Sequence, residues 1–389
     1  MIPHLLRIVA MAAAAGTFAA MGYSVLCLWS AAAFLRETPP ATETSPGAFP
    51  PVSILKPLKG IDPEMYESLR SHCRQNYPEY EIIFGVSDAA DPAIKLVERL
   101  QLEFAGRNIR LVHCGEELGA NVKVSNLIQM LPEAAHEILL VNDSDIQVGA
   151  DYLRRVVTRL NEPNVGLVTC LYRGVPGPTL GSHLESLGIS TDFCAGVLAA
   201  RLVEGGIHFG LGSTLAFRRS DLKASGGFQP LVDYLADDYE LGRRVAGRGR
   251  EVKLAKEVVE THLPAYTLRE FFAHQLRWMR TIREARPAGY AGLAFTFTLP
   301  WAVLALLCSA GALWAWYLLA LAAAFRGAVA LLVGKQVLCD ARAARELALI
   351  PLRDCLAMLL WLGGFLGHTV SWRGERFTLK NGKLIRAGR

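Results

Sequence analysis

Two long runs without a charged residue constrain this chain more than any other feature of its sequence. Residues 8–35 form the first run and residues 287–325 the second, and a shorter uncharged stretch covers residues 355–372. A helix needs about 20 predominantly apolar residues to cross a bilayer, so both long runs suffice. The 389 residues therefore leave room for membrane segments at both ends and one sizeable soluble domain between them.

The terminal regions leave some choices open. Small residues near positions 31–33 would also suit a cleaved signal peptide, but the apolar core of such a peptide normally has only about 7–15 residues. We therefore expect residues 1–36 to be a transmembrane anchor. Residues 287–372 fit two or three spanning helices, with a break near Pro300 or Gly311.

The positive charge of the chain gathers at its C-terminal end. The net charge is +5, and the segment from residue 371 onward carries all of that excess, so we expect a basic tail, residues 373–389. Such a tail stays cytoplasmic and touches anionic lipid headgroups. A cytoplasmic domain would then require an even number of C-terminal crossings. No basic stripe runs through the central domain, which argues against a nucleic-acid partner, and the scattered cysteines favour neither a zinc site nor disulfides.

Between the apolar runs, strand-like and helix-like patterns alternate. A linker rich in Pro, Thr and Ser, residues 37–51, comes first. The alternation predicts an α/β domain over residues 52–265, built from βαβ units around a mostly parallel sheet. In such sheets ligands bind beyond the carboxyl ends of the strands. The expected strands cover residues 52–58, 81–87, 109–113, 137–142, 165–171 and 210–219, and the expected helices cover residues 62–76, 92–105, 122–131, 150–160 and 234–247.

Two acids in the segment VNDSDIQV directly follow one of the expected strands. Asp143 and Asp145 are two residues apart, so in an extended backbone their side chains point to the same side. Carboxylate oxygens are the ligands that Mg²⁺ and Mn²⁺ prefer, and such an ion neutralises the charge of a departing diphosphate. The pair therefore suits a metal-bound nucleotide-sugar site, although acids also commonly end strands as turn residues.

Two further segments offer groups for the nucleotide. Asp88 and Asp91 in VSDAADP follow the second expected strand, where they would accept from a uracil ring or from ribose hydroxyls; the alternative is an Asx turn before Pro92. Lys123 and Asn126 in GANVKVSNL lie at the start of an expected helix, where donors meet anionic or base oxygens. A capped surface helix is the alternative there.

The adjacent acids of LADDYELG are candidates for acid–base chemistry. Asp237 and Asp238 repel each other, which raises the pKa of one of them toward values useful to a general base. We expect Asp238 to take the proton from an acceptor hydroxyl and Asp237 to contact the acceptor or the diphosphate. A helix N-terminus that favours acids through its dipole would also explain the pair.

The segment LREFFAHQLRWMRTI predicts an amphipathic helix. Its apolar residues fall on one arc, while His274 and Arg277 lie on the opposite side. Beside membrane spans, such a helix lies in the bilayer interface, and we expect this for residues 266–286. Arg277 would then face the sheet and clamp a diphosphate through two hydrogen bonds. The alternative is an ordinary packed helix with its arginines in water.

Together these segments resemble the ceramide glucosyltransferase family, membrane-bound inverting glycosyltransferases with a GT-A fold. The resemblance rests on the N-terminal anchor and on LKPLKGIDP, DAADPA, NDSDI, LADDY, the RW motif and SWRGERFTLKNG. The chain is also similar to bacterial hopanoid-biosynthesis glycosyltransferases, in KVSNLIQM, VGLVTCLYRG and HQLRWMRTIR.

The resemblance implies a GT-A, Rossmann-like catalytic domain, a UDP-sugar donor, a lipid acceptor and a divalent metal, Mn²⁺ or Mg²⁺. It makes Asp88 or Asp91 the first aspartate of the family pattern. The remaining implied roles are Asp143 and Asp145 as the metal pair, Asp238 as the base, and His274 through Trp278 as the (Q/R)xxRW motif. The chain departs from the pattern at His274, where the family has Gln or Arg.

Several functions remain open from the sequence. The leading one is transfer of glucose from UDP-glucose to ceramide or a similar lipid, by a multi-pass protein whose catalytic domain faces the cytoplasm of a bacterial inner membrane. A variant uses UDP-N-acetylglucosamine and a hopanoid polyol. A processive polysaccharide synthase needs more long spans than this chain offers. A transporter or receptor predicts charges inside the spans, and residues 8–35 and 287–325 have none.

Overall fold

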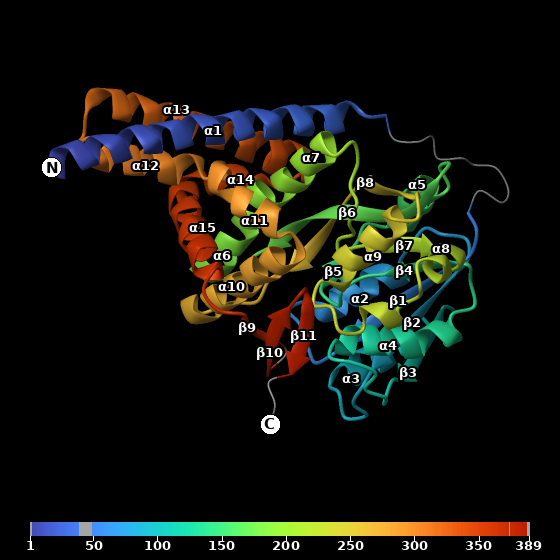
Figure 1. Cartoon of the computed structure of the whole chain (residues 1–389). Helices are drawn as coiled ribbons and strands as arrows, with labels where there is room; N and C mark the ends of the chain where they lie inside the picture. Colours follow the sequence, from blue (N-terminus) through green and yellow to red (C-terminus); the bar gives the residue numbers. More distant parts are fainter. Residues whose placement is uncertain (1, 39–48, 373, 387–389) are drawn as a thin grey trace. The chain divides into compact units, whose positions relative to one another are not determined.

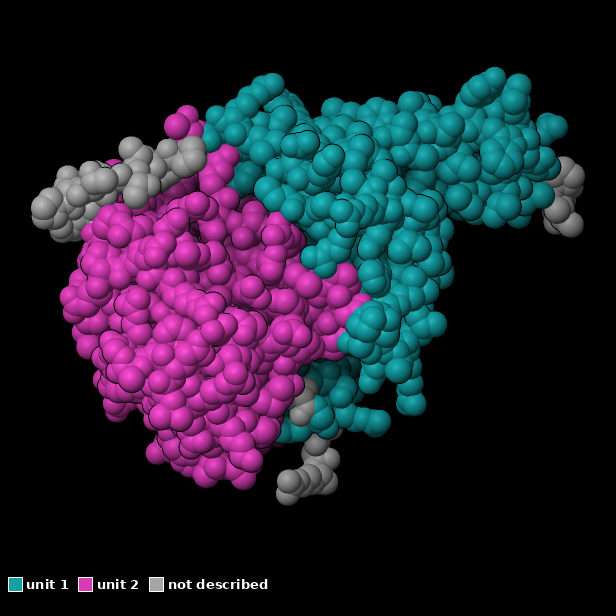
Figure 2. Space-filling model, turned by 180° about the vertical axis from the view of Figure 1, so that it is seen from behind, with its two compact units in different colours: residues 1–37, 178–203, 265–381 teal, residues 38–177, 204–264, 382–389 magenta. Residues whose placement is uncertain are grey.

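The computed structural model describes residues 2–38, 49–372 and 374–386 (Figure 1). Most of the predicted linker and parts of the predicted basic tail, including Arg373 and residues 387–389, lie outside the described residues. The chain forms two compact units (Figure 2), and each unit is made of three separate segments of the chain. Unit 1 contains residues 1–37, 178–203 and 265–381, and unit 2 contains residues 38–177, 204–264 and 382–389.

Unit 2 is built on an eight-stranded mixed sheet with the order β3-β2-β1-β4-β7-β6-β8-β5. The first four strands in this order are parallel, β7 is antiparallel to both of its neighbours, and β6 and β8 are parallel to each other. This arrangement confirms the predicted α/β class. The strands are β1 Val52–Leu58, β2 Tyr80–Val86, β3 Asn108–His113, β4 Ile138–Val141, β5 Ile146–Gln147, β6 Val165–Val175, β7 Leu215–Arg218 and β8 Glu251–His262. β11 Lys383–Arg386 belongs to a second sheet of three strands.

The helices of unit 2 follow the strands in the predicted alternation. Every residue of β1, β2 and β4 is buried, as expected for parallel strands covered on both faces. Helix α5 buries one face, which includes Leu153, Val156 and Leu160, against this sheet. The helices are α2 Met65–Cys73, α3 Ala93–Glu103, α4 Val122–Met130, α5 Tyr152–Leu160, α8 Arg219–Ala224 and α9 Asp237–Ala246, with short 3₁₀ turns at Leu131–Glu133 and Gln229–Leu231.

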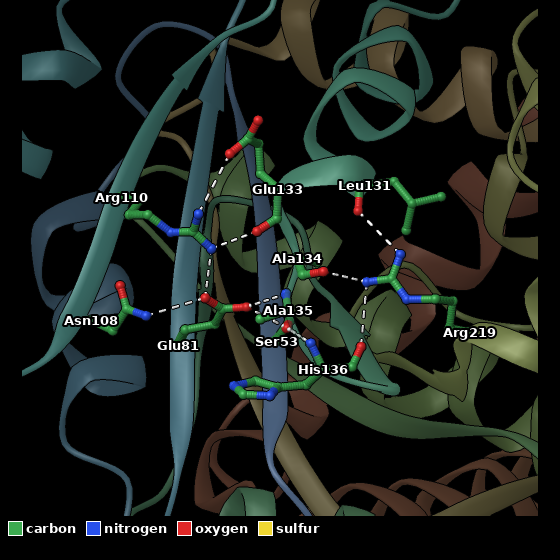
Figure 3. Close-up of polar contacts among 10 residues, drawn as sticks. All are labelled: Ser53, Glu81, Asn108, Arg110, Leu131, Glu133, Ala134, Ala135, His136 and Arg219. Atoms are coloured by element: carbon green, nitrogen blue, oxygen red, sulfur yellow. Dashed lines mark hydrogen bonds and ion pairs between the residues drawn. The ribbon is translucent and has the colours of Figure 1, made fainter.

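A buried carboxylate, that of Glu81, holds the loop that leads into β4 (Figure 3). Glu81 is 1% exposed and accepts hydrogen bonds from the Ser53 hydroxyl at 2.6 Å, the Ala135 amide at 2.7 Å and the Arg110 guanidinium at 2.6 Å. Burial alone would raise the pKa of Glu81, but these hydrogen bonds lower it. Arg219 donates to carbonyls of the same loop, among them that of Leu131 at 3.2 Å. The loop that leads into β4 is therefore firmly placed.

Unit 1 consists mainly of apolar helices. Helix α1 packs against α12, α13 and α7; its Ala13 is fully buried, and the Ser24 hydroxyl lies 3.2 Å from that of Thr298. The elements are α1 Ile2–Arg36, α6 Leu180–Gly188, the π-helix η2 Ile189–Phe193, α7 Cys194–Val203, α10 Leu268–Ala285, α11 Pro287–Gly292, η4 Leu293–Thr296, α12 Thr298–Cys308, α13 Leu313–Val329, the π-helix η5 Ala330–Val337, α14 Ala341–Arg345, η6 Leu347–Leu349, α15 Ile350–Gly364, and strands β9 Thr369–Trp372 and β10 Glu375–Lys380.

Four helical stretches in the described residues are long and apolar enough to cross a membrane, and a bent pair makes a fifth if it counts as one span. The four are His4–Arg36, Leu180–Val203, Leu313–Val337 and Leu347–Gly364, and the pair, bent by 54°, is Pro287–Thr296 with Thr298–Cys308. These helices are those of a membrane protein, as the sequence predicts.

The structure refines where these stretches begin and end. The helices break at both predicted places: at Gly311, whose φ is +76°, and just before Pro300, where Pro287–Thr296 and Thr298–Cys308 meet at 54°. Pro300 itself lies in the first turn of α12, where proline removes no helical hydrogen bond. The stretch 355–372 is not one helix: α15 begins at Ile350, and residues 369–372 form β9. Residues 178–203 group with the apolar helices, so the prediction that they belong to the domain of residues 52–265 is wrong. Their Gly and Ser residues lower the hydropathy of the segment and hid it in the sequence.

Candidate active site

The acidic pair follows β4 at a tightly held point of unit 2. Asn142, which is fully buried, donates to the Tyr152 hydroxyl at 2.9 Å and to the Ser213 carbonyl at 2.7 Å, and its carbonyl oxygen lies 3.1 Å from His72 Nε2. The amide of Asp143 donates to the Gly212 carbonyl at 3.2 Å. The loop before β7 is thereby attached to the end of β4.

Asp143 and Asp145 lie in a turn, so the predicted extended backbone is wrong. The Ile146 amide donates to the Asp143 carbonyl at 3.4 Å across this turn. Burial, followed by the negative charge of Asp143, raises the pKa of Asp145 to about 6. The two carboxylates are therefore close enough to repel each other. The Thr261 hydroxyl donates to Asp145 Oδ2 at 2.5 Å, while 43% of the Asp143 side chain is exposed.

Lys123 joins the acidic pair to the second acidic segment. Its Nζ lies 2.8 Å from Asp143 Oδ1 and 3.1 Å from Asp237 Oδ2. Although burial opposes the charged form, the surrounding carboxylates raise the pKa of Lys123. Asn121 holds both segments in place, because it caps α4 and donates to the Tyr234 carbonyl at 2.7 Å and to Asp237 at 3.3 Å.

A glycine brings Asp238 beside Asp143. The Gly212 amide donates to Asp238 Oδ2 at 2.7 Å, and the Tyr239 amide donates to Asp238 Oδ1 at 2.7 Å. A Cβ on Gly212 would lie 2.6 Å from Asp143 Oδ2 and 3.3 Å from Asp238 Oδ2, so a side chain at this position would push the Asp143 carboxylate away from Asp238. Burial, followed by the charge of Asp237, raises the pKa of Asp238 to about 6. A carboxylate with this pKa suits general base chemistry near neutral pH.

Lys56 is a site residue that the sequence analysis missed. It is the one charged residue of β1, it is fully buried, and its ammonium donates to the Asp143 carbonyl at 2.7 Å. Burial lowers the pKa of Lys56 to about 7, against the opposing charges of Asp145 and Asp143. The signal was present in the sequence as a lysine inside the otherwise uncharged strand VSILKPL.

The other predicted nucleotide contacts have local partners in the structure. Asp91 accepts from the Gly60 amide at 2.9 Å and from the Ala93 amide at 2.9 Å. It therefore forms the Asx turn around Pro92 that was the alternative interpretation, and it holds the loop after β1. Asp88 is exposed and accepts from the Ala90 amide at 2.8 Å. Asn126 is 1% exposed, and its Oδ1 has no hydrogen-bond partner among the described residues. Their roles in binding the nucleotide stay predictions.

The RW motif lies on α10 in unit 1. His274 Nδ1 is 3.0 Å from Oε2 of Glu185, a residue 2% exposed. The His274 ring stacks on Tyr266 at 5.4 Å between centroids, and the Trp278 ring meets Phe193 edge-on at 5.9 Å. His274 therefore lies on the face of α10 that packs against α6. Leu268 and Phe272, which belong to the predicted apolar arc, are 53% and 38% exposed.

The two acids that follow β4 fit a divalent cation whose remaining ligands come from the substrate and from water. Asp143 and Asp145 offer the hard oxygen ligands that Mg²⁺ and Mn²⁺ prefer. Among residues 2–38, 49–372 and 374–386, no three His, Cys, Asp or Glu side chains form a ready-made metal cluster. An ion here would draw further ligands from phosphate oxygens and water, as Mg²⁺ commonly does.

Comparison with known proteins places the chain in a family. Residues 12–385 match the model of Glycosyl transferase family 21, and the chain belongs to this family. Ceramide glucosyltransferase 3 of Caenorhabditis elegans is 26% identical over 234 residues, which are 60% of this chain and 50% of that protein. Ceramide glucosyltransferase of Komagataella phaffii is 37% identical over 114 residues, which are 28% of this chain and 22% of that protein.

The match to the C. elegans relatives spans about half of their length. Among solved structures, the chain resembles the mannosyltransferase PcManGT from Pyrobaculum calidifontis in complex with GDP-Man and Mn²⁺, with a TM-score of 0.55. The two are 21% identical, and the likeness covers 93% of this chain and 99% of that chain. This likeness confirms the predicted GT-A fold.

Proposed function

We propose that this protein transfers glucose from UDP-glucose to the hydroxyl group of ceramide or a similar membrane lipid. Family membership supports a glycosyltransferase, and the relatives named ceramide glucosyltransferase favour a lipid acceptor. The observation that carries the chemistry is the placement of Asp238 beside Asp143, with Gly212 between them. A base and a cation-binding carboxylate are thereby held next to each other.

The reaction follows as a single displacement with inversion. Asp238 accepts the proton of the acceptor hydroxyl as that oxygen attacks the anomeric carbon. The bond from that carbon to the diphosphate oxygen breaks, and UDP leaves with the bonding electrons. The amides of Gly212 and Tyr239 hold the Asp238 carboxylate in place before the proton moves.

In this proposal, cations meet the diphosphate of the donor. Asp143 and Asp145 would hold Mn²⁺ or Mg²⁺, which neutralises the charge that develops on the leaving diphosphate. Lys123, between Asp143 and Asp237, adds a fixed ammonium that orients these carboxylates. We assign Arg277 to a second contact with the diphosphate, since a guanidinium donates two parallel hydrogen bonds to phosphate oxygens.

The placement in the membrane is part of the same proposal. The basic C-terminal tail faces the cytoplasm, together with the catalytic unit, and α10 lies at the bilayer interface, where the lipid acceptor enters. A bacterial inner membrane suits the hopanoid-like phrases of the sequence. Those phrases also support a second candidate, transfer of N-acetylglucosamine to a hopanoid polyol.

One assay tests both candidates. The purified protein is incubated with Mn²⁺ or Mg²⁺, with UDP-glucose or UDP-N-acetylglucosamine, and with a panel containing ceramide, a hopanoid polyol and diacylglycerol. Products are then identified by mass spectrometry, and released UDP is measured. We expect glucosylceramide with release of one UDP per product. A hopanoid product would select the second candidate, and no UDP release with any lipid would refute both.

A further inference from the structure

Four charged side chains are buried or half-buried among the apolar helices of unit 1. They are Asp192 on the π-helix η2, Arg326 on α13, and Arg353 and Asp354 on α15. The exposed fractions of the side chains are 35% for Asp192, 7% for Arg326 and 5% for Asp354. Charges inside membrane segments are costly to bury, and those that occur usually belong to a functional site.

Arg326 and Asp354 form an ion pair with two hydrogen bonds. Arg326 donates from Nε and Nη2 to the two oxygens of Asp354, both at 2.7 Å. Its Nη2 also donates to Asp192 Oδ1 at 2.7 Å, and its Nη1 donates to the Thr191 carbonyl at 3.3 Å. This half of the cluster connects α13, α15 and η2 and needs no ligand.

Arg353 and Asp192, by contrast, have polar atoms without a hydrogen-bond partner in the described part of the chain. The Arg353 side chain is only 6% exposed, and Nη2 lies 3.5 Å from Asp192 Oδ2. Within the described residues, Nε and Nη1 of Arg353 and Oδ2 of Asp192 have no hydrogen-bond partner. Buried donors and acceptors are nearly always paired, because leaving one unpaired is costly. These three atoms therefore point to a ligand group that both donates and accepts.

The backbone around these atoms is shaped to leave room for the Arg353 side chain. A Cβ on Gly188 would lie 2.4 Å from both Nε and Nη2 of Arg353. Asp192 belongs to a π-helical segment, a geometry that frequently occurs at functional sites. The next residue, Phe193, packs its ring against Trp278 of the RW motif. The unsatisfied pair thus adjoins a motif that the proposed function already uses.

The charges of the cluster indicate the class of ligand. Two arginines and two aspartates balance, so a ligand that carries a net charge would leave one charge uncompensated in an apolar unit. A neutral hydroxyl or amide group meets both needs, because each has a donor and an acceptor. We propose that Arg353 and Asp192 bind the neutral hydroxyl- and amide-bearing head of the acceptor lipid and discriminate against lipids with an anionic head. This inference rests on the proposed function and names the acceptor class.

Direct lipid binding tests the inference without requiring turnover. The full-length protein in nanodiscs is exposed to N-octanoyl-sphingosine or undecaprenyl phosphate, and bound lipid is measured by native mass spectrometry. We expect the wild type to prefer the neutral amide lipid. Arg353→Gln should weaken its binding about tenfold or more, as expected for lost hydrogen bonds to a charged group. Asp192→Asn leaves an extra positive charge and should shift the preference toward the phosphate lipid.

Matched variants separate binding from folding. Arg201→Gln removes an arginine that pairs with Glu37 in the same unit and should leave lipid preference unchanged. Gly188→Ala displaces Arg353 and should weaken binding, whereas Gly196→Ala should not, because its Cβ would be 3.4 Å from the Tyr23 hydroxyl, an ordinary contact. Thermal unfolding of each variant shows whether it is folded.

Kinetics provide the second readout. If the transfer assay succeeds, Arg353→Gln should raise the KM for the acceptor and leave the KM for the nucleotide sugar unchanged. Unchanged lipid preference and acceptor KM in folded Arg353→Gln and Asp192→Asn variants would overturn the inference while the proposed function stands. Selective lipid binding without any transfer by the wild type would refute the proposed function instead, and would leave this site as a neutral-lipid site.

Discussion

At the scale of single residues, Asp238 depends on a neighbour that has no side chain. Gly212 donates its amide to Asp238 and leaves space beside Asp143. The raised pKa of Asp238 and the two amides on its carboxylate describe a base that is both held in place and only moderately acidic. This environment makes the role of Asp238 testable by a substitution that preserves its shape.

Asp238→Asn should lower kcat by about 10²–10⁴, the usual contribution of a positioned general base. The asparagine carbonyl still accepts one backbone amide, so UDP binding should stay within about threefold of the wild type. Transfer kinetics and UDP titration by calorimetry measure the two effects. Asp151→Asn, which affects only a hydrogen bond with Asn76, is the control. Lost UDP binding would argue against the base assignment.

Glu81→Gln should lower the free energy of unfolding by about 2 kcal/mol at neutral pH, because a buried charged acceptor loses its ion pair with Arg110. The folded-state pKa of Glu81 lies below its ordinary value of 4.5. Its stabilising contribution is therefore fully present above that value and is lost as the pH falls through the folded-state pKa. The difference between variant and wild type should shrink in acid.

Denaturation of the detergent-solubilised protein at neutral and acidic pH measures this difference. Glu133→Gln is the control, since Glu133 faces the same Arg110 but its side chain is 52% exposed. An exposed ion pair contributes about 0–1 kcal/mol. Equal losses of unfolding free energy in the two variants would show that burial does not strengthen the interaction between Glu81 and Arg110.

At the scale of elements, α10 carries its motif on a packed face. A capping box of Thr267 and Glu270 begins the helix, and the His274 imidazole partners the buried carboxylate of Glu185. The family pattern has Gln or Arg at this position, and both side chains can donate a hydrogen bond to a carboxylate. The departure at His274 therefore preserves the ability to donate.

His274→Gln should keep transfer within about tenfold of the wild type, because the amide still donates to Glu185. His274→Ala leaves a buried carboxylate without its partner and should lower the unfolding free energy by about 3 kcal/mol. Thermal unfolding and transfer rates are compared with Arg269→Ala, an exposed position on the same helix. Equal behaviour of the Gln and Ala variants would mean that Glu185 needs no donor.

At the scale of the whole molecule, α1 is part of unit 1 as well as a candidate span. Its buried alanines pack against α12 and α13. Ala13→Leu should therefore destabilise the protein by about 1–3 kcal/mol through overpacking. Ala12→Leu, at an exposed position, should have no such effect, and unfolding midpoints in detergent compare the two. Deleting residues 1–36 should yield aggregated protein, and a soluble, monodisperse product would contradict this role of α1.

Particular residues show how far the sequence could predict the site. Asp143, Asp145, Asp237 and Asp238 were predicted as a set, because acids after buried strands and at a helix start leave a local signal. Lys123 was predicted from its place at a helix N-terminus. Lys56 was not predicted, because a lysine in an otherwise uncharged strand is an unusual residue but does not show which group it contacts; only the structure pairs it with the Asp143 carbonyl.

The sequence by itself determined the α/β class, the apolar helices and the order of the acidic motifs, because periodicity, hydropathy and residue type are local properties. Only the tertiary structure decided that residues 178–203 join the apolar helices and that Gly212 separates two acids. It also decided that Asp192, Arg326, Arg353 and Asp354 form one cluster. Such pairings connect residues far apart in the chain, and their energies depend on distance and burial, which no local pattern encodes.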